Sequence, residues 1–285
     1  MIRPNPIGSA RHFAHEAMRT TFSIRILGGG EAEARAMANE CFDRLEILEN
    51  HLSRFLDGSD VWRINHMQAG ETLYLSEECH ECLLLAMDAY SRTGGLFDVT
   101  LGRAVEHRKS GAAGPPPPVE GRLVIHPDTP AVTCETPGRE IDLGGIGKGF
   151  ALDCLAGLLS EWGAESALLA AGASTLLAMG PEAWPVDLAG EGETRRIDLR
   201  GRAFSASGTG IQGSHVVDPR EGAGDGGAPI PWKRVWVLAP DAALADAMST
   251  AALLMDAGEL AGFAAGADGP DAVWADDGTR LAEFA

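Results

Sequence analysis

Residues 141–150 have the sequence IDLGGIGKGF, in which a strand end turns through four glycines into the start of a helix. Glycine lets a backbone approach a phosphate closely, and a helix start offers free N–H groups and partial positive charge. Lys148 adds a full positive charge. A P-loop would need Ser or Thr in place of Gly149, and a dinucleotide fingerprint would need glycine in place of Phe150. Taken alone, the stretch is compatible with a phosphate site or with a tight connection.

Working outward from this turn, hydrophobic periodicity predicts a mixture of strands and helices. Strands are expected over residues 20–27, 123–125, 132–134, 140–143, 167–171, 184–188, 195–199 and 235–238. Helices are expected over residues 31–52, 76–90, 148–162 and 243–255. A terminal hairpin is expected from 272–275 and 280–284, around Asp277 and Gly278. Because strict βαβ alternation is missing, the predicted class is α+β, with mixed or antiparallel sheets, packed helices and two lobes in one unit.

The predicted organisation is an N-terminal extension over residues 1–17 followed by one unit over 18–285. Within that unit, residues 110–121 include four successive prolines and predict an exposed loop or a connection between lobes. The 285 residues are 45% hydrophobic, which is enough for a sizeable core.

The charge of the chain constrains its ligands. With 23 basic and 41 acidic residues, the net charge is −18, which disfavours nucleic acid and anionic membranes as partners. Any phosphate ligand therefore needs a local cradle of N–H groups, a lysine or a metal ion.

The N-terminal residues contain no apolar run of the kind found in signal peptides, and no membrane-spanning stretch follows. The cytoplasm is the expected compartment, or the periplasm if an export signal has been removed. Five cysteines form no regular framework, which favours reduced thiols. Cys79 and Cys82 form a CxxC on a predicted helix, so a plain helix face is favoured over a zinc or redox site.

Two further segments carry candidate chemistry. Asp246 and Thr250 are four residues apart on one predicted helix face with Ser249 alongside, a hard-oxygen set that suits Mg²⁺. From spacing alone, the favoured alternative is that Thr250 bonds to its own helix while Asp246 is solvated. In the second segment, His215 and Asp218 flank a short β-branched step, and a lone histidine of this kind is more often structural than a base.

Taken together, these segments resemble the ApbE flavin-transferase family, the FAD:protein FMN transferases. The resemblance runs in order from about Met18 to Met255. The matching blocks are Leu52–Phe55 with Ser59, Asp60, Ile64 and Asn65; Gly94–Gly102; Asp142–Phe150; Ser207 and Gly208; Ser214–Pro219; and Asp246–Thr250.

The resemblance implies a magnesium site formed by the backbone carbonyl of Gly147 and the side chains of Asp246 and Thr250, with Ser249 nearby. This reverses the preference drawn from spacing alone. The resemblance also implies His215 as the catalytic base. Implied flavin contacts are Met18, Phe55, Phe97, Asp98, Val99, Asp142, Lys148 and Val217.

The implied activity is Mg²⁺-dependent transfer of FMN from FAD to a threonine or serine hydroxyl of an acceptor flavoprotein, with release of AMP. Hydrolysis of FAD to FMN and AMP, and a non-catalytic FAD-binding assembly factor, are the alternatives. The sequence departs from the family at Gly147, where alanine is usual, and at Ala171–Ser174, which has one glycine where two are usual.

Overall fold

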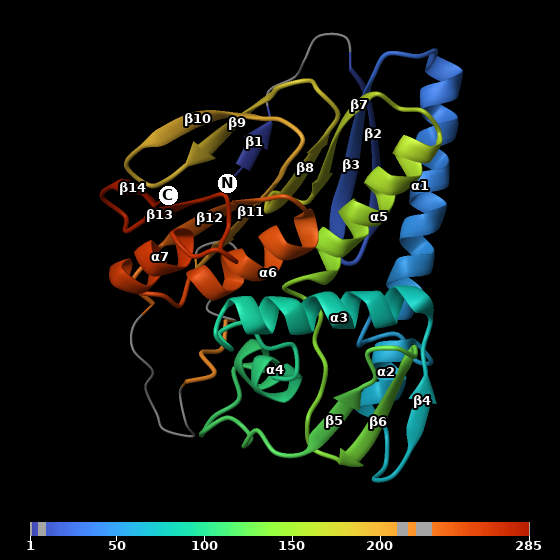
Figure 1. The fold of residues 1–285 in the computed structure, drawn as a ribbon, viewed down its shortest axis with the longest axis vertical. Helices are drawn as coiled ribbons and strands as arrows, with labels where there is room; N and C mark the ends of the chain where they lie inside the picture. The colour runs from blue at the N-terminus through green and yellow to red at the C-terminus, as the bar shows by residue number, and fades with distance from the viewer. Residues whose placement is uncertain (1, 5–9, 210–215, 221–229, 285) are drawn as a thin grey trace.

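The computed structural model describes residues 2–4, 10–209, 216–220 and 230–284 (Figure 1). Its centre is an eight-stranded sheet in which every neighbouring pair of strands is antiparallel. In spatial order the strands are β14 (Leu281–Phe284), β13 (Ala272–Asp276), β12 (Arg234–Ala239), β11 (Ala203–Gly208), β8 (Thr175–Met179), β7 (Ser166–Ala171), β3 (Thr20–Leu27) and β2 (Arg11–Ala17).

The two faces of this sheet bury different hydrophobic cores, because side chains alternate along each strand. On β7, Ala167 and Leu169 belong to one buried cluster, whereas Leu168 and Ala170 belong to the other. Helices α1 (Glu31–Leu52), α5 (Gly147–Glu161) and α6 (Ala242–Ala252) cover the first face (Figure 1).

The second face is covered by a small antiparallel sheet of strands β1 (Ile2–Pro4), β9 (Trp184–Ala189) and β10 (Thr194–Leu199). The core between the two sheets contains three tryptophans, Trp184, Trp236 and Trp274. None of their indole N–H groups has a hydrogen-bond partner among the described atoms.

A second lobe lies beyond α3 (Glu77–Arg92), which Figure 1 shows between the helices of the large sheet and the rest of the chain. It contains α2 (Asp60–Asn65), α4 (Gly102–Ser110) and a three-stranded sheet. The strands of that sheet, in order, are β4 (Thr72–Tyr74), β6 (Ala131–Thr136) and β5 (Arg122–Ile125). Helix α7 (Ala257–Ala264) packs against β13 and β14.

The predicted α+β class with antiparallel sheets is confirmed, and the helix predicted over residues 31–52 has those bounds as α1. Residues 11–17, which the sequence predicts to lie in an N-terminal extension, form β2 of the large sheet. Strands β8 and β11 and helices α2, α4 and α7 were not predicted. In the predicted proline-rich loop, residues 111–121 carry no helix or strand, and Ser110 is the last residue of α4. Within the described ranges, no helix has both the length and the apolar character to cross a membrane.

The strand predicted over residues 140–143 is wrong. Its backbone forms an isolated bridge between Glu140 and Leu101 and one hydrogen bond from the Asp142 N–H to the Val99 carbonyl, but no strand ladder. A side chain replaces a neighbouring strand, because Asn65 accepts from the Ile141 N–H at 2.6 Å and donates to the Ile141 carbonyl at 3.0 Å. The apolar pattern of this segment therefore reflects burial between the lobes.

Candidate active site at the start of α5

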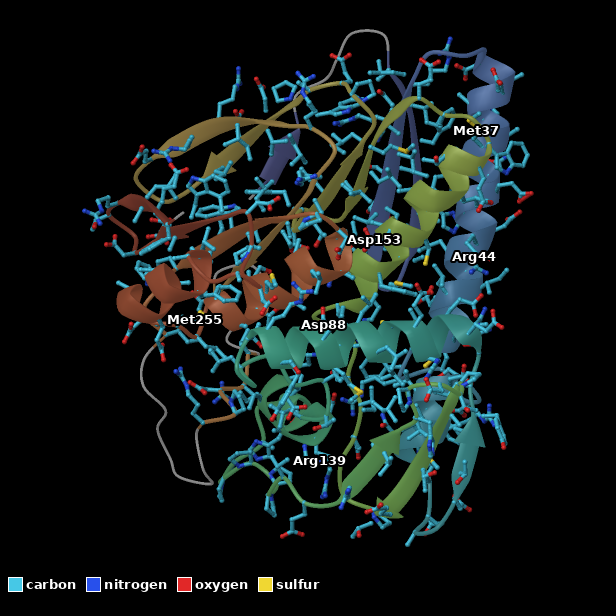
Figure 2. All side chains as sticks on the ribbon, in the orientation of Figure 1. Met37, Arg44, Asp88, Arg139, Asp153 and Met255 are labelled. Carbon is cyan, nitrogen blue, oxygen red and sulfur yellow. The ribbon has the colours of Figure 1, made fainter. Side chains whose placement is uncertain are left out.

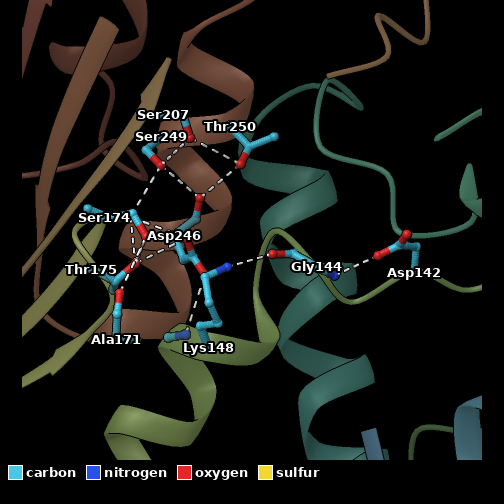
Figure 3. A network of polar contacts seen from close by, with 12 residues as sticks. Asp142, Gly144, Lys148, Ala171, Ser174, Thr175, Ser207, Asp246, Ser249 and Thr250 are labelled. Atoms are coloured by element: carbon cyan, nitrogen blue, oxygen red, sulfur yellow. Dashed lines mark hydrogen bonds and ion pairs between the residues drawn. The ribbon is translucent and has the colours of Figure 1, made fainter. Parts of the chain in front are cut away.

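The glycine turn and helix α6, nearly 100 residues apart in sequence, meet at one point (Figure 3). Lys148 Nζ lies 3.6 Å from Asp246 Oδ2, and the Asp246 side chain is buried. Lys148 Nζ also donates to the Gly144 carbonyl at 2.8 Å. The lysine is therefore held by its own turn and by the carboxylate of the second helix.

The two helices approach this closely because α5 presents a glycine to α6. A Cβ on Gly149 would lie 2.1 Å from the Ala242 carbonyl oxygen, so no side chain fits there. One turn later, Asp153 accepts hydrogen bonds from the N–H groups of Ala242 and Ala243, each at 2.8 Å. These N–H groups are the otherwise unsatisfied donors at the start of α6. Asp153 thus ties the start of α6 to α5 (labelled in Figure 2).

Hydroxyl groups surround the Asp246 carboxylate. Thr175 and Ser205, both fully buried on the helix-covered face of the large sheet, donate to Asp246 Oδ1 at 3.3 Å and 3.2 Å. The Gly149 N–H donates to Oδ2 at 3.4 Å. A buried carboxylate must be compensated, and here hydroxyls, an N–H group and one lysine do so.

Further hydroxyls line the next turn of α6. Ser249 and Thr250 donate to the Asp246 carbonyl at 2.9 Å and 3.2 Å, and Ser207 lies within hydrogen-bond distance of both hydroxyls (Figure 3). Thr250 therefore makes the bond to its own helix that the alternative interpretation expected. The other half of that alternative is wrong, because Asp246 is only 4% exposed.

The loop that carries the predicted flavin contacts Phe97 and Val99 lies beside this hydroxyl cluster. A Cβ on Gly145 would lie 3.0 Å from the Phe97 ring and 3.3 Å from Thr250 Oγ1. Phe97 and Val99 are both buried, and the Val99 carbonyl accepts from the Asp142 N–H at 2.8 Å. The structure thus brings Phe97 and Val99 next to the glycine turn, with Phe97 and Thr250 on either side of Gly145.

Asp142 is the centre of a charged network between the lobes. Arg54 Nη1 lies 3.2 Å and Lys109 Nζ 3.5 Å from its carboxylate, which also accepts from the Gly144 N–H at 2.8 Å. Burial acts to raise the pKa of Asp142, but Lys109, the Gly144 N–H and Arg54 together hold that pKa below its ordinary value. Asp142 therefore stays ionised and anchors the start of the glycine turn.

The remaining predicted contacts are more peripheral. Asp98 accepts from Thr100, and its carboxylate lies 3.6 Å from Arg139. The Phe55 ring is 53% exposed. Met18 and Val217 are half-buried. His215, the predicted base, lies outside the described residues.

The donor set of the cluster suits a hard divalent cation. Among described residues, no group of three or more His, Cys, Asp or Glu side chains could hold a metal ion. The site instead offers one buried carboxylate, neutral hydroxyls and the backbone of Gly147, where α5 begins. Oxygen-only ligation of this kind fits Mg²⁺. Thr175 and Ser205 were missed from sequence, because a hydroxyl on a buried strand carries no distinguishing pattern.

The CxxC motif is a helix face, as favoured from sequence. Cys79 and Cys82 are both buried on α3, and burial raises the pKa of each thiol well above its ordinary value. All five cysteines are free thiols.

A lysine, a buried carboxylate and several hydroxyls at a helix start make an arrangement suited to binding a phosphate group together with a divalent cation. Comparison with known proteins shows the family of the chain. The chain belongs to the ApbE family, whose model matches residues 18–274, and the family suggested by the sequence motifs is thereby confirmed.

Relatives and solved structures resemble the chain over most of its length. The FAD:protein FMN transferase of Klebsiella pneumoniae is 25% identical over 292 residues, covering 88% of this chain and 80% of the relative. That of Chlamydia pneumoniae is 26% identical, covering 85% and 84%. The flavin transferase ApbE of Vibrio cholerae has a similar fold, with a TM-score of 0.78 at 19% identity over 97% of this chain and 98% of that one.

Proposed function

We propose that this chain transfers FMN from FAD to a threonine or serine hydroxyl of an acceptor protein. The acceptor oxygen forms a bond to the phosphorus of the FMN half, and the bond from that phosphorus to the bridging oxygen breaks. AMP leaves with the bridging oxygen. Family membership and the names of the curated relatives support this activity.

The observation that carries the proposal is the convergence of Lys148 and Asp246 at the start of α5, with their charged atoms 3.6 Å apart. A chain of net charge −18 attracts a diphosphate only where cations and N–H groups gather locally. Lys148 and the first N–H groups of α5 supply such a place. Lys148 would bind a phosphate oxygen and offset the charge that develops during transfer.

The residues that would hold Mg²⁺ are Asp246, Thr250 and the backbone carbonyl of Gly147, with Ser249 adjacent. When bound, the ion supplies charge neutralisation and Lewis acidity toward phosphate oxygens. The role of the chain itself is to hold the Asp246 carboxylate in a fixed orientation. Thr175 and Ser205 do this by donating to the carboxylate oxygen Oδ1.

The flavin half would be held by Met18, Phe55, Phe97, Asp98, Val99, Asp142 and Val217. Phe97 and Val99 lie beside the glycine turn, which supports placing the flavin next to the phosphate site. His215 would take the proton of the acceptor hydroxyl as the new bond forms.

The test is to incubate the protein with FAD, MgCl₂ and an acceptor domain, and to measure AMP by chromatography and covalent flavin by mass spectrometry. We expect AMP and flavin-bearing acceptor in equal amounts, and neither product when EDTA is added. An acceptor with its target threonine changed to valine is the matched control. Release of AMP with free FMN and no adduct would instead indicate hydrolysis, and intact bound FAD would indicate a carrier.

A further inference from the structure

The hairpin between β2 and β3 has an unusual two-residue loop. Ala17 pairs with Thr20, so Met18 and Arg19 form the whole turn. Their φ angles are +50° and +59°, and among described residues they are the only ones other than glycine with positive φ. Such short hairpin turns usually place Asn, Asp or Gly at these positions, because glycine has no Cβ and the short side chains of Asn and Asp can hydrogen-bond to the local backbone, whereas longer side chains are strained there.

The pairing of β2 and β3 keeps the turn closed, but no contact of the Arg19 side chain with a described residue explains why an arginine occupies this position. Its guanidinium lies 5.5 Å from the centre of the Phe55 ring, and both side chains are exposed. No carboxylate of a described residue lies within 4.0 Å of it. An exposed contact between a cation and an aromatic ring is weaker than the penalty of a left-handed backbone. Backbone strain that the surrounding structure maintains is concentrated at active sites and ligand-binding positions.

The turn also lies close to the phosphate site. The Gly172 N–H donates to the Thr21 carbonyl at 2.8 Å, and a Cβ on Gly172 would lie 2.6 Å from Thr20 Oγ1. Gly172 belongs to the connection that leads into Thr175, whose hydroxyl donates to Asp246. The hairpin turn that carries Arg19 is therefore linked through Gly172 and Thr175 to Asp246. The Arg19 side chain extends to Phe55.

We infer that Arg19 is a substrate-binding residue that contacts the isoalloxazine ring of bound FAD alongside Phe55. This inference rests on the proposed function, in which Phe55 and Met18 contact the flavin. A guanidinium can lie flat against a planar ring and can donate to the carbonyl oxygens of its pyrimidine edge. The turn holds the Arg19 guanidinium beside the Phe55 ring, from where it would face the isoalloxazine ring.

The first test measures stability and affinity on the same variants. Arg19→Gly and Arg19→Asn relieve the backbone strain, so we expect the melting temperature to rise by about 2 °C. The same variants lose the guanidinium, so we expect the Kd for FAD, measured by calorimetry, to rise roughly fivefold. A residue with only a structural role would not move these two quantities in opposite directions. Unchanged FAD affinity in both variants would overturn the inference.

The second test uses ligands that share only part of FAD. Riboflavin carries the isoalloxazine ring without phosphate, and ADP carries the adenosine and diphosphate without the ring. We expect Arg19→Asn to weaken FAD and riboflavin by the same factor and to leave ADP binding unchanged. Weakened ADP binding with unchanged riboflavin binding would overturn the assignment to the ring. Arg200→Asn, at an exposed arginine beyond β10, is the control for general loss of positive charge and should change none of the affinities.

The outcomes also separate this inference from the proposed function. If the wild-type protein transfers FMN but Arg19→Asn binds and transfers equally well, only the role of Arg19 fails. If the wild-type protein binds no FAD, the proposed function fails and the inference fails with it.

Discussion

The same strands form both faces of the large sheet, but the buried polar groups on the two faces differ in whether they are hydrogen-bonded. On β8, Thr175 faces α6 while Leu176 faces the small sheet, and on β11 Ser205 and Phe204 divide in the same way. The helix-covered face therefore contains buried hydroxyls that are all hydrogen-bonded. The opposite face contains three buried indole N–H groups without a partner among the described atoms.

This difference shows where the fold tolerates unsatisfied polar groups. An unpaired indole N–H lowers stability, but it belongs to a large apolar ring whose packing offsets this cost. A buried carboxylate such as Asp246 cannot be left uncompensated, so its neighbours are fixed. We therefore expect substitutions on the helix-covered face to change chemistry, and substitutions on the opposite face to change stability alone.

The largest effect is expected for Asp246→Ala. Loss of the Asp246 carboxylate from the hydroxyl cluster should lower kcat for AMP release by about a thousandfold or more. The measurement is metal-dependent AMP release at saturating FAD, with circular dichroism to show that the protein is folded. Asp246→Asn keeps the shape and the acceptor for Thr175 and Ser205, so it separates loss of charge from misfolding. Wild-type turnover in either variant would remove Asp246 from the site.

On the opposite face, Trp236→Ala should lower the free energy of unfolding by about 3–5 kcal/mol, because a fully buried indole leaves a cavity. Denaturant unfolding measures this loss. Turnover per folded molecule should stay at the wild-type value, since Trp236 faces away from α6. A lowered kcat in the folded fraction would break the comparison between the faces.

The junction of α5 and α6 tests whether the attachment of α6 to α5 affects turnover. Asp153→Asn can accept only one of the two N–H groups of α6, and the remaining buried donor should cost about 1–3 kcal/mol of stability. We also expect a lower kcat, because α6 carries Asp246. Asp241→Ala removes the N-cap of the same helix and should cost about 1 kcal/mol with turnover unchanged. Equal kinetic losses in both variants would mean that general helix stability, not attachment to α5, sets turnover.

The contribution of Asp153 to stability should depend on pH with a defined sign. Burial raises the pKa of Asp153 from 3.8 to about 7, with Asp241 and Asp246 adding to the rise and the two N–H donors opposing it. The folded state then binds more protons than the unfolded state between these values. Stability should therefore fall as pH increases from about 4 to about 7, and Asp153→Asn should remove that part of the decline. Urea titrations across this range measure it.

The smallest effect is expected for Trp184→Phe. Removing an unpartnered buried N–H is favourable, whereas the smaller ring leaves a void, and the two terms are similar in size. The free energy of unfolding should change by less than about 1.5 kcal/mol. A loss of several kcal/mol would show that the indole N–H has a partner in solution.

Sequence patterns predicted the parts of the fold with strong periodicity or turn signals. The bounds of α1 were predicted, and so was the terminal hairpin around Asp277, since both follow from local sequence. The apparent strand at residues 140–143 failed because Asn65, distant in sequence, supplies its hydrogen bonds. Strand β8 lacked a turn signal strong enough to separate it from β7.

The candidate site likewise contains residues that the sequence indicates and residues that it does not. Spacing alone favoured a solvated Asp246, and only the family resemblance placed this carboxylate with the glycine turn. Local sequence contains no information about Thr175 and Ser205, whose roles depend on the register of β8 and β11 beneath α6. Sequence motifs thus indicated which residues carry charge, while tertiary packing determines which hydroxyls hold that charge in place.

The burial of the thiols has a practical consequence for studying acceptor binding. Cys41, Cys79, Cys82 and Cys134 are buried, and desolvation raises the pKa of Cys41 and of the half-buried Cys154 to about 12, so these thiols react slowly with maleimides. A fluorophore could therefore be attached selectively to one engineered surface cysteine without first replacing the native ones. Contact with an acceptor protein could then be followed in the otherwise unaltered chain.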